Sequence, residues 1–233
     1  MEMAKRQPEG LRKLILPHEI IRSKRKTLSI AIDPFGRLIV RAPIQCAQSR
    51  IEAFLKEKEA WILRKQSERQ AVGVQKAPED LNGYELFIVG KKYRIVYVEE
   101  NAIRIDFEKG LLYLPKSNAK KRLLVWLKEN ALRILTKSAE MQAERMGVTF
   151  KRVEINSARR SWGLCTGENV LRFSFRLLFA PKEVVEYVVI HELAHVRHKN
   201  HSARFWSEVQ KYEPRYKERR AWLKKYAALM EIF

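Results

Sequence analysis

The chain has 233 residues, of which 46% are hydrophobic and 10% aromatic, which suffices for a core and excludes wholesale disorder. Its 47 Lys and Arg against 27 Asp and Glu give a formal net charge of +20, so its surface should attract anions such as nucleotides or nucleic acid. There is no apolar signal segment, no stretch long enough to cross a membrane and no cysteine framework, so we expect a cytoplasmic protein.

The first half of the chain reads as β-rich. Residues 26–32 alternate between apolar and polar, and a turn at Asp33-Pro34-Phe35-Gly36 leads to a second apolar pair, which predicts a β-hairpin. Apolar residues then recur at helical spacing over 49–66, and residues 70–83 look like a linker. Further strands are predicted over 85–89, 93–98, 102–107 and 111–114.

The second half is mainly helical. A long amphipathic helix covers Leu124 to Met141 and is closed by Gly147. Strands are predicted over 148–155 and 170–175, joined by a polar connection, and a helix follows Pro181. Two last helical segments cover 202–212 and 216–230. We therefore expect an α+β fold, with a β-rich region over 1–116 and a zinc-binding helical region with a small sheet over 117–233.

The chemistry is concentrated in the helix after Pro181. It carries His191-Glu192-Leu193-Ala194-His195, an H-E-x-x-H motif. Two histidines four residues apart lie on one helix face and can reach a single Zn²⁺ ion, which lowers the pKa of a bound water to about 7. Glu192 is one step round the helix, where its carboxylate can act as the general base. The motif predicts a zinc-dependent hydrolase.

A catalytic zinc site needs a third ligand, and His201 is our first choice. On an unbroken helix it would lie about 15 Å beyond His191, so the helix must end and the chain must turn back. We predict the reversal at Asn200, in the left-handed conformation, with Ser202 capping the next helix.

Three other residues are alternative third ligands. His198 shares a helical face with His191 and His195, but it would lie about 10.5 Å along the axis from His191. Glu208 and Glu213 are weaker options, on the two-histidine-plus-glutamate pattern of thermolysin-like sites.

The segment Tyr187 to His195, with Asn200-His201-Ser202 and Phe205-Trp206 after it, resembles the YgjP-like metal-dependent hydrolases, relatives of the SprT and WLM zinc metallopeptidases. The resemblance extends to Arg160-Ser161-Trp162-Gly163-Leu164-Cys165, where the family pattern reads Arg-Trp-Gly-Ser-Cys. It implies three histidine ligands at His191, His195 and His201 and a catalytic glutamate at Glu192, the same residues that the spacing indicates.

The substrate stays open between three classes. A metallopeptidase-type hydrolase acting on peptides is the first hypothesis, a nucleoside triphosphate pyrophosphatase the second, and a nucleic-acid-associated SprT-like protease the third. If the connection before the active helix folds over the metal, Arg159, Arg160 and Trp162 would bind an anionic substrate. Cys165 lies far from the histidines in sequence, and we expect it to be a small buried hydrophobe.

Overall fold

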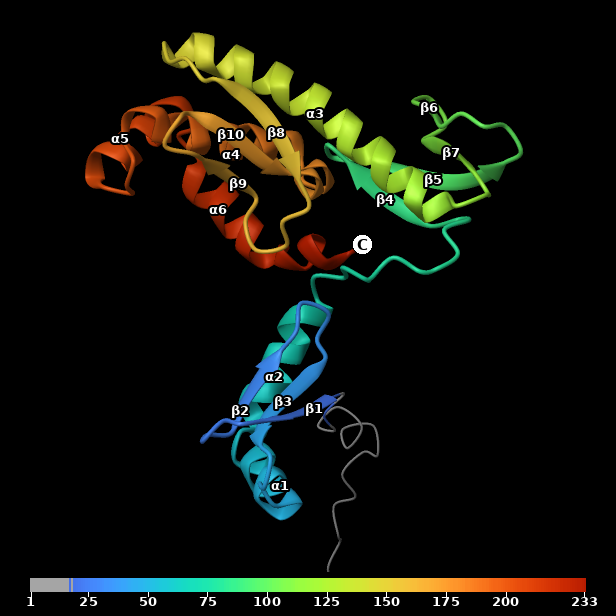
Figure 1. Cartoon of the computed structure of the whole chain (residues 1–233), viewed down its shortest axis with the longest axis vertical. Coiled ribbons are helices and arrows are strands. Elements are labelled where there is room, and N and C mark those ends of the chain that lie inside the picture. The colour runs from blue at the N-terminus through green and yellow to red at the C-terminus, as the bar shows by residue number, and fades with distance from the viewer. Residues whose placement is uncertain (1–16, 18) are drawn as a thin grey trace, which may run out of the picture. The chain divides into compact units, whose positions relative to one another are not determined.

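The structure is a computed structural model that describes residues 17 and 19–233, and it divides into two compact units, Met1–Lys76 and Ala77–Phe233. Figure 1 labels the helices and strands of both units. The predicted α+β class is confirmed: small mixed sheets are accompanied by helices in each unit. The predicted regional division at residue 116 stays a prediction. Within the described residues, no helix has the length and apolar character that crossing a bilayer requires.

The first unit is a three-stranded sheet with two helices. Its elements are β1 (Glu19–Ser23), β2 (Ser29–Ile32), β3 (Leu38–Pro43), α1 (Gln48–Glu57) and α2 (Glu59–Gln70). The predicted hairpin is confirmed, because β2 and β3 pair antiparallel around the turn, where Asp33 Oδ1 accepts the backbone N–H groups of Phe35 and Arg37. The pairing of β1, parallel to β3 at the other edge, was not predicted.

One helix was predicted over 49–66, but the structure has two, interrupted at Lys58 (φ −95°, ψ 7°). The interruption falls between the buried pair Ile51 and Leu55 and the buried pair Ile62 and Gln66, so each half packs its own pair. Gln66 donates a hydrogen bond to the carbonyl of Gly36 at 3.0 Å, which ties α2 to the hairpin turn.

The second unit opens with a four-stranded sheet of order β4-β5-β7-β6. Its strands are β4 (Glu85–Ile88), β5 (Lys91–Val98), β6 (Arg104–Asp106) and β7 (Leu111–Pro115), as the sequence predicted. Helix α3 (Ala119–Met146) follows and ends at Gly147, whose φ of 64° is the left-handed conformation that glycine tolerates best. Its buried residues recur every four positions from Leu123 to Ala143.

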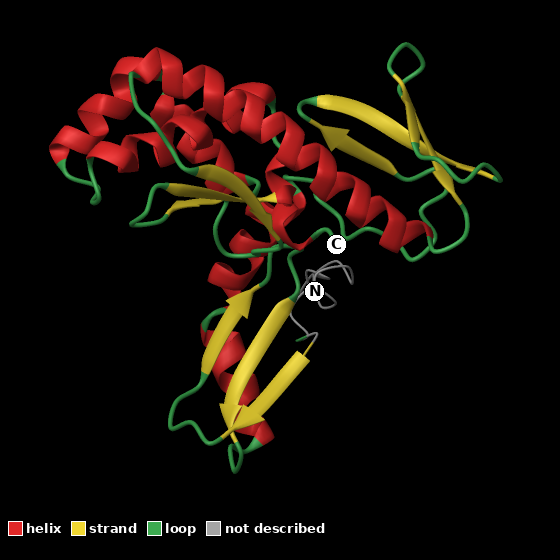
Figure 2. Cartoon of the chain, turned by 45° about the horizontal axis from the view of Figure 1, so that its top comes forward, coloured by secondary structure: helices red, strands yellow, loops and turns green. Residues whose placement is uncertain are grey.

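Helix α3 passes from this sheet to the second sheet of the unit (Figures 1 and 2), and it packs against β7, β8 and α4. That second sheet has the order β8-β10-β9, with β8 and β10 parallel and β9 antiparallel to β10. Its strands are β8 (Arg152–Asn156), β9 (Gly163–Cys165) and β10 (Val170–Ser174). The three residues of β9 lie inside the stretch predicted as a polar connection.

The remaining elements are helical: the 3-10 helix η2 (Phe175–Phe179), α4 (Lys182–Arg197), α5 (Ala203–Tyr212), α6 (Tyr216–Lys225) and the 3-10 helix η3 (Ala227–Glu231). Nine of the sixteen residues of α4 are buried, and the helix contacts α3, α5, α6 and β9. A helix surrounded on several sides is held rigidly, so the side chains that it carries have fixed positions.

Candidate metal centre

Helix α4 positions the first two histidines. Pro181 precedes the helix with φ −59°, a value that proline fixes, and Val184, Val185 and Val188 are buried beyond it. His191 and His195 lie one turn apart on the same face, with their ring centroids 5.1 Å apart. The structure thus places the two histidines of the motif side by side, as their spacing predicted.

The chain reverses directly after α4. The helix ends at Arg197 and His198 is extended (φ −123°, ψ 98°), so the reversal begins before the predicted position. The prediction that Asn200 adopts the left-handed conformation is wrong, since Asn200 is not among the residues with positive φ. Its side-chain oxygen instead accepts the backbone N–H of Ser202 at 3.2 Å. The predicted cap is confirmed, because the Ser202 hydroxyl accepts the N–H of Phe205.

A single guanidinium holds the end of α4 in place. Arg197 donates to the carbonyl oxygens of Met146 and Gly147 at 2.8 and 2.9 Å, at the end of α3, where carbonyls lack partners within the helix. It also forms an ion pair with Glu208 of α5. The end of α3, the end of α4 and the body of α5 therefore share one side chain.

The reversal returns His201 to the other two histidines. Nε2 of His201 lies 3.0 Å from Nε2 of His191, and one ring nitrogen from each of the three histidines lies within 4.8 Å of the others. Four ligands arranged tetrahedrally at about 2.0–2.1 Å from one ion lie roughly 3.4 Å apart, so this spacing fits a shared ion. The three residues that we predicted as ligands thus converge, two of them half-buried and His201 exposed.

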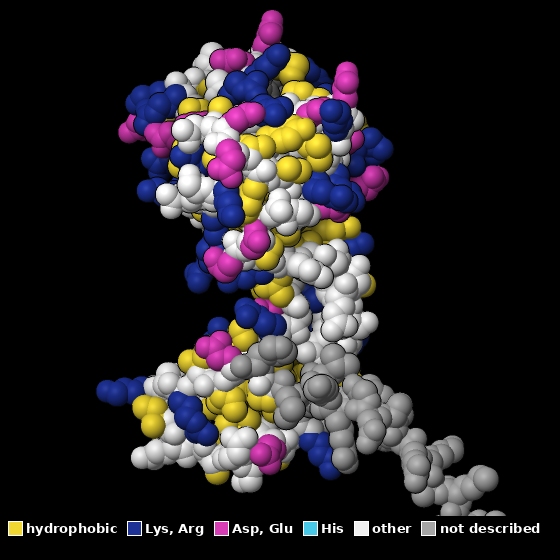
Figure 3. Space-filling model, turned by 90° about the vertical axis from the view of Figure 1, so that its right-hand side faces the viewer, with side chains coloured by type: hydrophobic (Ala, Val, Ile, Leu, Met, Phe, Trp, Pro, Cys, Tyr) yellow, Lys and Arg dark blue, Asp and Glu magenta, His cyan; other side chains and the backbone are white. Residues whose placement is uncertain are grey.

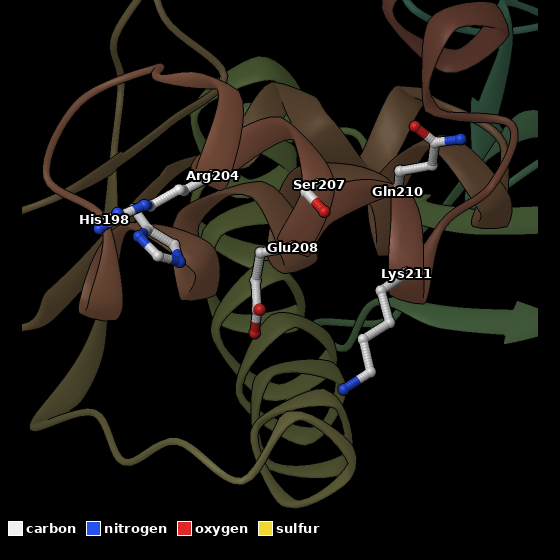
Figure 4. Close-up of a pocket in the computed structure, with 6 residues that line it drawn as sticks. All are labelled: His198, Arg204, Ser207, Glu208, Gln210 and Lys211. Carbon is white, nitrogen blue, oxygen red and sulfur yellow. The ribbon is translucent and has the colours of Figure 1, made fainter.

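His198 does not join the cluster with its side chain. It lines a separate surface pocket of about 650 Å³ together with Arg204 and Glu208 (Figure 4). Its backbone carbonyl, however, lies 2.8 Å from Nδ1 of His195. If Nδ1 carries the proton and donates this bond, Nε2 keeps its lone pair for a cation, which is how a ligand histidine is usually oriented.

The two glutamates considered as third ligands are placed elsewhere. Glu208 forms the ion pair with Arg197, and Glu213 lies 3.9 Å from Arg219. Of the described residues, only the three histidines form a group with metal-binding spacing.

An aromatic layer supports the three imidazoles. The ring of Phe205, which is fully buried, lies 4.4 Å from the ring of His195 and 4.8–4.9 Å from the other two. Trp206 stacks on His201 with centroids 5.6 Å apart. This layer excludes water from one side of the cluster and fixes the ring orientations.

Burial keeps the imidazoles in the form that binds a cation. Burial, together with the neighbouring His195 and His201 and the charge of Arg220, lowers the pKa of His191 to about 3. Burial also lowers the pKa of His195, against the opposing effect of its bond to the carbonyl of His198. Both rings are therefore neutral at pH 7, and each presents a lone pair.

Glu192 lies next to the cluster and has an unusual pKa. Its side chain is only 5% exposed, and burial raises its pKa from 4.5 to about 7, although a backbone hydrogen bond from Cys165 acts in the opposite direction. A carboxyl group with a pKa near neutrality can both accept and return a proton at physiological pH.

Strand β9 forms the wall opposite Glu192. A Cβ atom on Gly163 would lie only 2.7 Å from Oε1, 2.8 Å from Cγ and 3.0 Å from Cδ of Glu192, so only glycine fits there. In an antiparallel pair, every second residue of a strand forms its backbone hydrogen bonds with the partner strand. Trp162 and Thr166 form such bonds with β10, so the backbone N–H and C=O groups of Gly163 and Cys165 point the other way, to the free edge of the sheet. Glu192 is thus held by two residues whose role sequence reasoning missed. Cys165, expected only as a buried hydrophobe, acts through its main chain.

The predicted substrate residues directly precede β9 in the same connection. The guanidinium of Arg159 pairs with Glu231 at 3.3 Å and donates to the carbonyl of Phe233 at 3.1 Å. Arg160 is exposed. Trp162 is half-buried directly before Gly163, and its carbonyl accepts the N–H of Ser174. The side chain of Arg159 is therefore engaged near the C-terminus, and the predicted substrate role of the three residues stays a prediction.

We compared the chain with known proteins to find its family. The search of curated proteins found no match. Among solved structures, the crystal structure of the metallopeptidase zymogen of Pyrococcus abyssi abylysin is 26% identical, with a TM-score of 0.36, over 39% of this chain and 93% of that one. The family model described as "YgjP-like, metallopeptidase domain" matches residues 26–226. That match covers most of the sequence and confirms the resemblance seen in the motifs, so the chain belongs to the YgjP-like metallopeptidase family.

Proposed function

We propose that this metallopeptidase-family protein is a zinc-dependent peptidase in which His191, His195 and His201 bind the metal and Glu192 is the general base. The observation that carries the proposal is the convergence of three ring nitrogens within 4.8 Å beside a buried carboxyl group on the same helix. His191 and His201 are ten positions apart in the sequence, yet they meet beside Glu192, whose pKa is about 7. Such a combination is typical of a functional site.

The donor set fits zinc. Three neutral imidazoles are nitrogen ligands of the kind that zinc accepts, and three protein ligands leave a fourth position for water or substrate. When bound, zinc would polarise the carbonyl of the scissile bond and lower the pKa of a water molecule. The bond between Nδ1 of His195 and the carbonyl of His198 would orient one ligand ring.

Glu192 would move the proton. Its carboxylate takes a proton from the attacking water and then delivers it to the leaving amine nitrogen, and both steps are feasible near pH 7 because the pKa is about 7. The backbone N–H of Cys165 orients the carboxylate, and the absence of a side chain on Gly163 lets β9 approach it.

A peptide is the substrate class that the surroundings favour. Strand β9 is an edge strand of its sheet, and its free edge lies beside Glu192. The side chain of Leu164 on this strand is half-exposed. An extended peptide can add to such an edge by main-chain hydrogen bonds, which would place a peptide bond near the histidines.

The two alternatives receive less support. A pyrophosphatase needs arginines that converge on the metal, but Arg159 is engaged by Glu231 and Phe233. On the face drawn in Figure 3, Lys and Arg side chains are interspersed with acidic and hydrophobic ones instead of forming one continuous stripe. Binding to nucleic acid through the +20 charge remains a proposal that the salt dependence of affinity would test.

The test is a parallel assay of the zinc-loaded protein on a peptide library and on nucleoside triphosphates, with Glu192→Gln as control. We expect one zinc per chain, peptide cleavage by the wild type and none by the variant. Nucleotide hydrolysis without peptide cleavage would refute the peptidase assignment, and undiminished activity of the variant would refute the role of Glu192.

A further inference from the structure

A second pocket lies beside the histidine cluster. It has a volume of about 470 Å³ and is lined by Trp206, Tyr216, Lys217, Arg220, Ala221 and Lys224. Trp206 connects it to the candidate metal centre, because the same indole stacks on His201 at 5.6 Å and on Tyr216 at 5.2 Å. A group bound in this pocket would therefore be one aromatic ring away from a proposed metal ligand.

The pocket carries three positive charges on one helix face. Lys217, Arg220 and Lys224 follow one another at intervals of three and four residues on α6, so they point to the same side. All three are exposed, and none forms an ion pair with a described residue. Arg219, one position away, is paired with Glu213, and the only acidic residue of α6, Glu218, does not line the pocket.

Of the three cations of the pocket, Arg220 is the one that lies over the Trp206 ring. Its guanidinium carbon lies 5.2 Å from the centroid of the Trp206 ring, a cation–π distance that holds the planar group over the indole. Its charge is also felt at His191, where it adds to the effects of burial and of the other histidines on the pKa. A guanidinium held in this way keeps its N–H groups free for a planar anion with two oxygens.

The aromatic groups argue for a carboxylate over a nucleobase. Recognition of a base uses an open aromatic face for stacking. The Trp206 ring already stacks on His201 and on Tyr216, and Tyr216 is only 9% exposed. The aromatic rings give the pocket a flat apolar surface, and the cations surround it. An acidic residue matches this arrangement, because its short apolar stem can lie on the rings while its carboxylate meets the cations.

We propose that this pocket is a substrate subsite that binds a carboxylate of the peptide close to the cleaved bond, and that it makes the enzyme selective for acidic peptides. The proposal rests on the proposed peptidase function. The carboxylate comes from an Asp or Glu side chain or from the C-terminus of the substrate, and the experiment below separates the two sources.

The experiment uses the full chain loaded with zinc and matched peptides that differ only at one position beside the scissile bond, Glu against Gln, each with a free or an amidated C-terminus. We expect kcat/KM to be about five- to tenfold higher for the peptide that carries the carboxylate in the subsite, and the preference to shrink as salt screens the cations. In Arg220→Gln the ratio should fall below about twofold. Arg215→Gln, the same substitution just outside the pocket at the N-cap of α6, should keep the wild-type ratio.

Binding gives a readout independent of turnover. With zinc-loaded Glu192→Gln protein and a peptide carrying an uncharged dye, the Glu peptide should bind about fivefold more tightly than the Gln peptide, and adding Arg220→Gln should remove the difference. Arg220→Glu should favour a Lys peptide.

Turnover of the Gln peptide shows whether the peptidase function holds, whatever the fate of the subsite. A preference for Glu over Gln assigns the carboxylate to the side chain, and a preference for the free over the amidated C-terminus assigns it to the chain end. Equal kcat/KM and equal affinity for all four peptides would overturn the subsite. Stronger binding of a nucleoside triphosphate than of the acidic peptide, lost in Arg220→Gln, would overturn it as well.

Discussion

The close approach of β9 to Glu192 makes Gly163→Ala a sharp test of the site. The new methyl group would lie 2.7 Å from Oε1 and 2.8 Å from Cγ of Glu192, so the side chain must move by at least about 0.6–0.7 Å to reach an ordinary van der Waals separation. A displacement of this size at a general base should lower kcat/KM by about 10- to 100-fold, which corresponds to roughly 1.4–2.7 kcal/mol of lost transition-state stabilisation. Overpacking should also lower the free energy of unfolding by about 1–3 kcal/mol.

Three measurements on the purified variant separate these effects: zinc content, thermal unfolding and steady-state cleavage of the best peptide. Gly167→Ala is the matched control, because nothing lies within 4 Å of a Cβ atom there, and it should behave as the wild type. In a Glu192→Asp background the side chain is one methylene shorter, so Gly163→Ala should cost much less than in the wild type. Wild-type kcat/KM for Gly163→Ala at full zinc content would refute the reasoning.

The other predictions concern the metal and the protons. Glu192→Gln should retain one zinc per chain by elemental analysis while kcat falls by about 10²- to 10⁴-fold, and loss of zinc instead would mean that the residue is a ligand. His201→Ala should lose zinc on dialysis and His198→Ala should retain it, because only the carbonyl of His198 contacts the site; the reverse result would contradict the ligand assignment. In the metal-free protein the pKa of Glu192 is raised from 4.5 to about 7, so the folded state binds the extra proton and its stability should fall as pH rises from about 4.5 to about 7. Compared with Glu192→Gln, the wild type should lose roughly 3 kcal/mol more of its free energy of unfolding over this pH range, as measured by thermal melts. If the stability of the two proteins changes with pH in the same way, the raised pKa of Glu192 is refuted.

Local patterns sufficed to predict much of the fold. The hairpin, the strands from Glu85 to Leu114, the long helix ending at Gly147 and the helix after Pro181 all follow from periodicity and from glycine or proline at their ends. The His191–His195 pair was predictable for the same reason, since both residues belong to one helix whose geometry fixes their separation.

Features that depend on distant parts of the chain were not predicted. Strand β1 pairs with a strand about 20 residues further on, and β9 is three residues long, too short for any periodicity. The contact of Cys165 and Gly163 with Glu192 joins positions almost 30 residues apart through packing alone. A glycine between Trp162 and Leu164 was the available signal, but a sequence alone does not reveal what a glycine must accommodate.

The three imidazoles do not share one support. Two extend from the buried helix α4, whereas His201 is exposed on the short segment between α4 and α5. A cation bound by all three would therefore be held by two nitrogens on one buried helix and by a third on a short segment outside it. Substitutions within residues 198–202 should then change the affinity for the metal while leaving the helix that carries the motif intact.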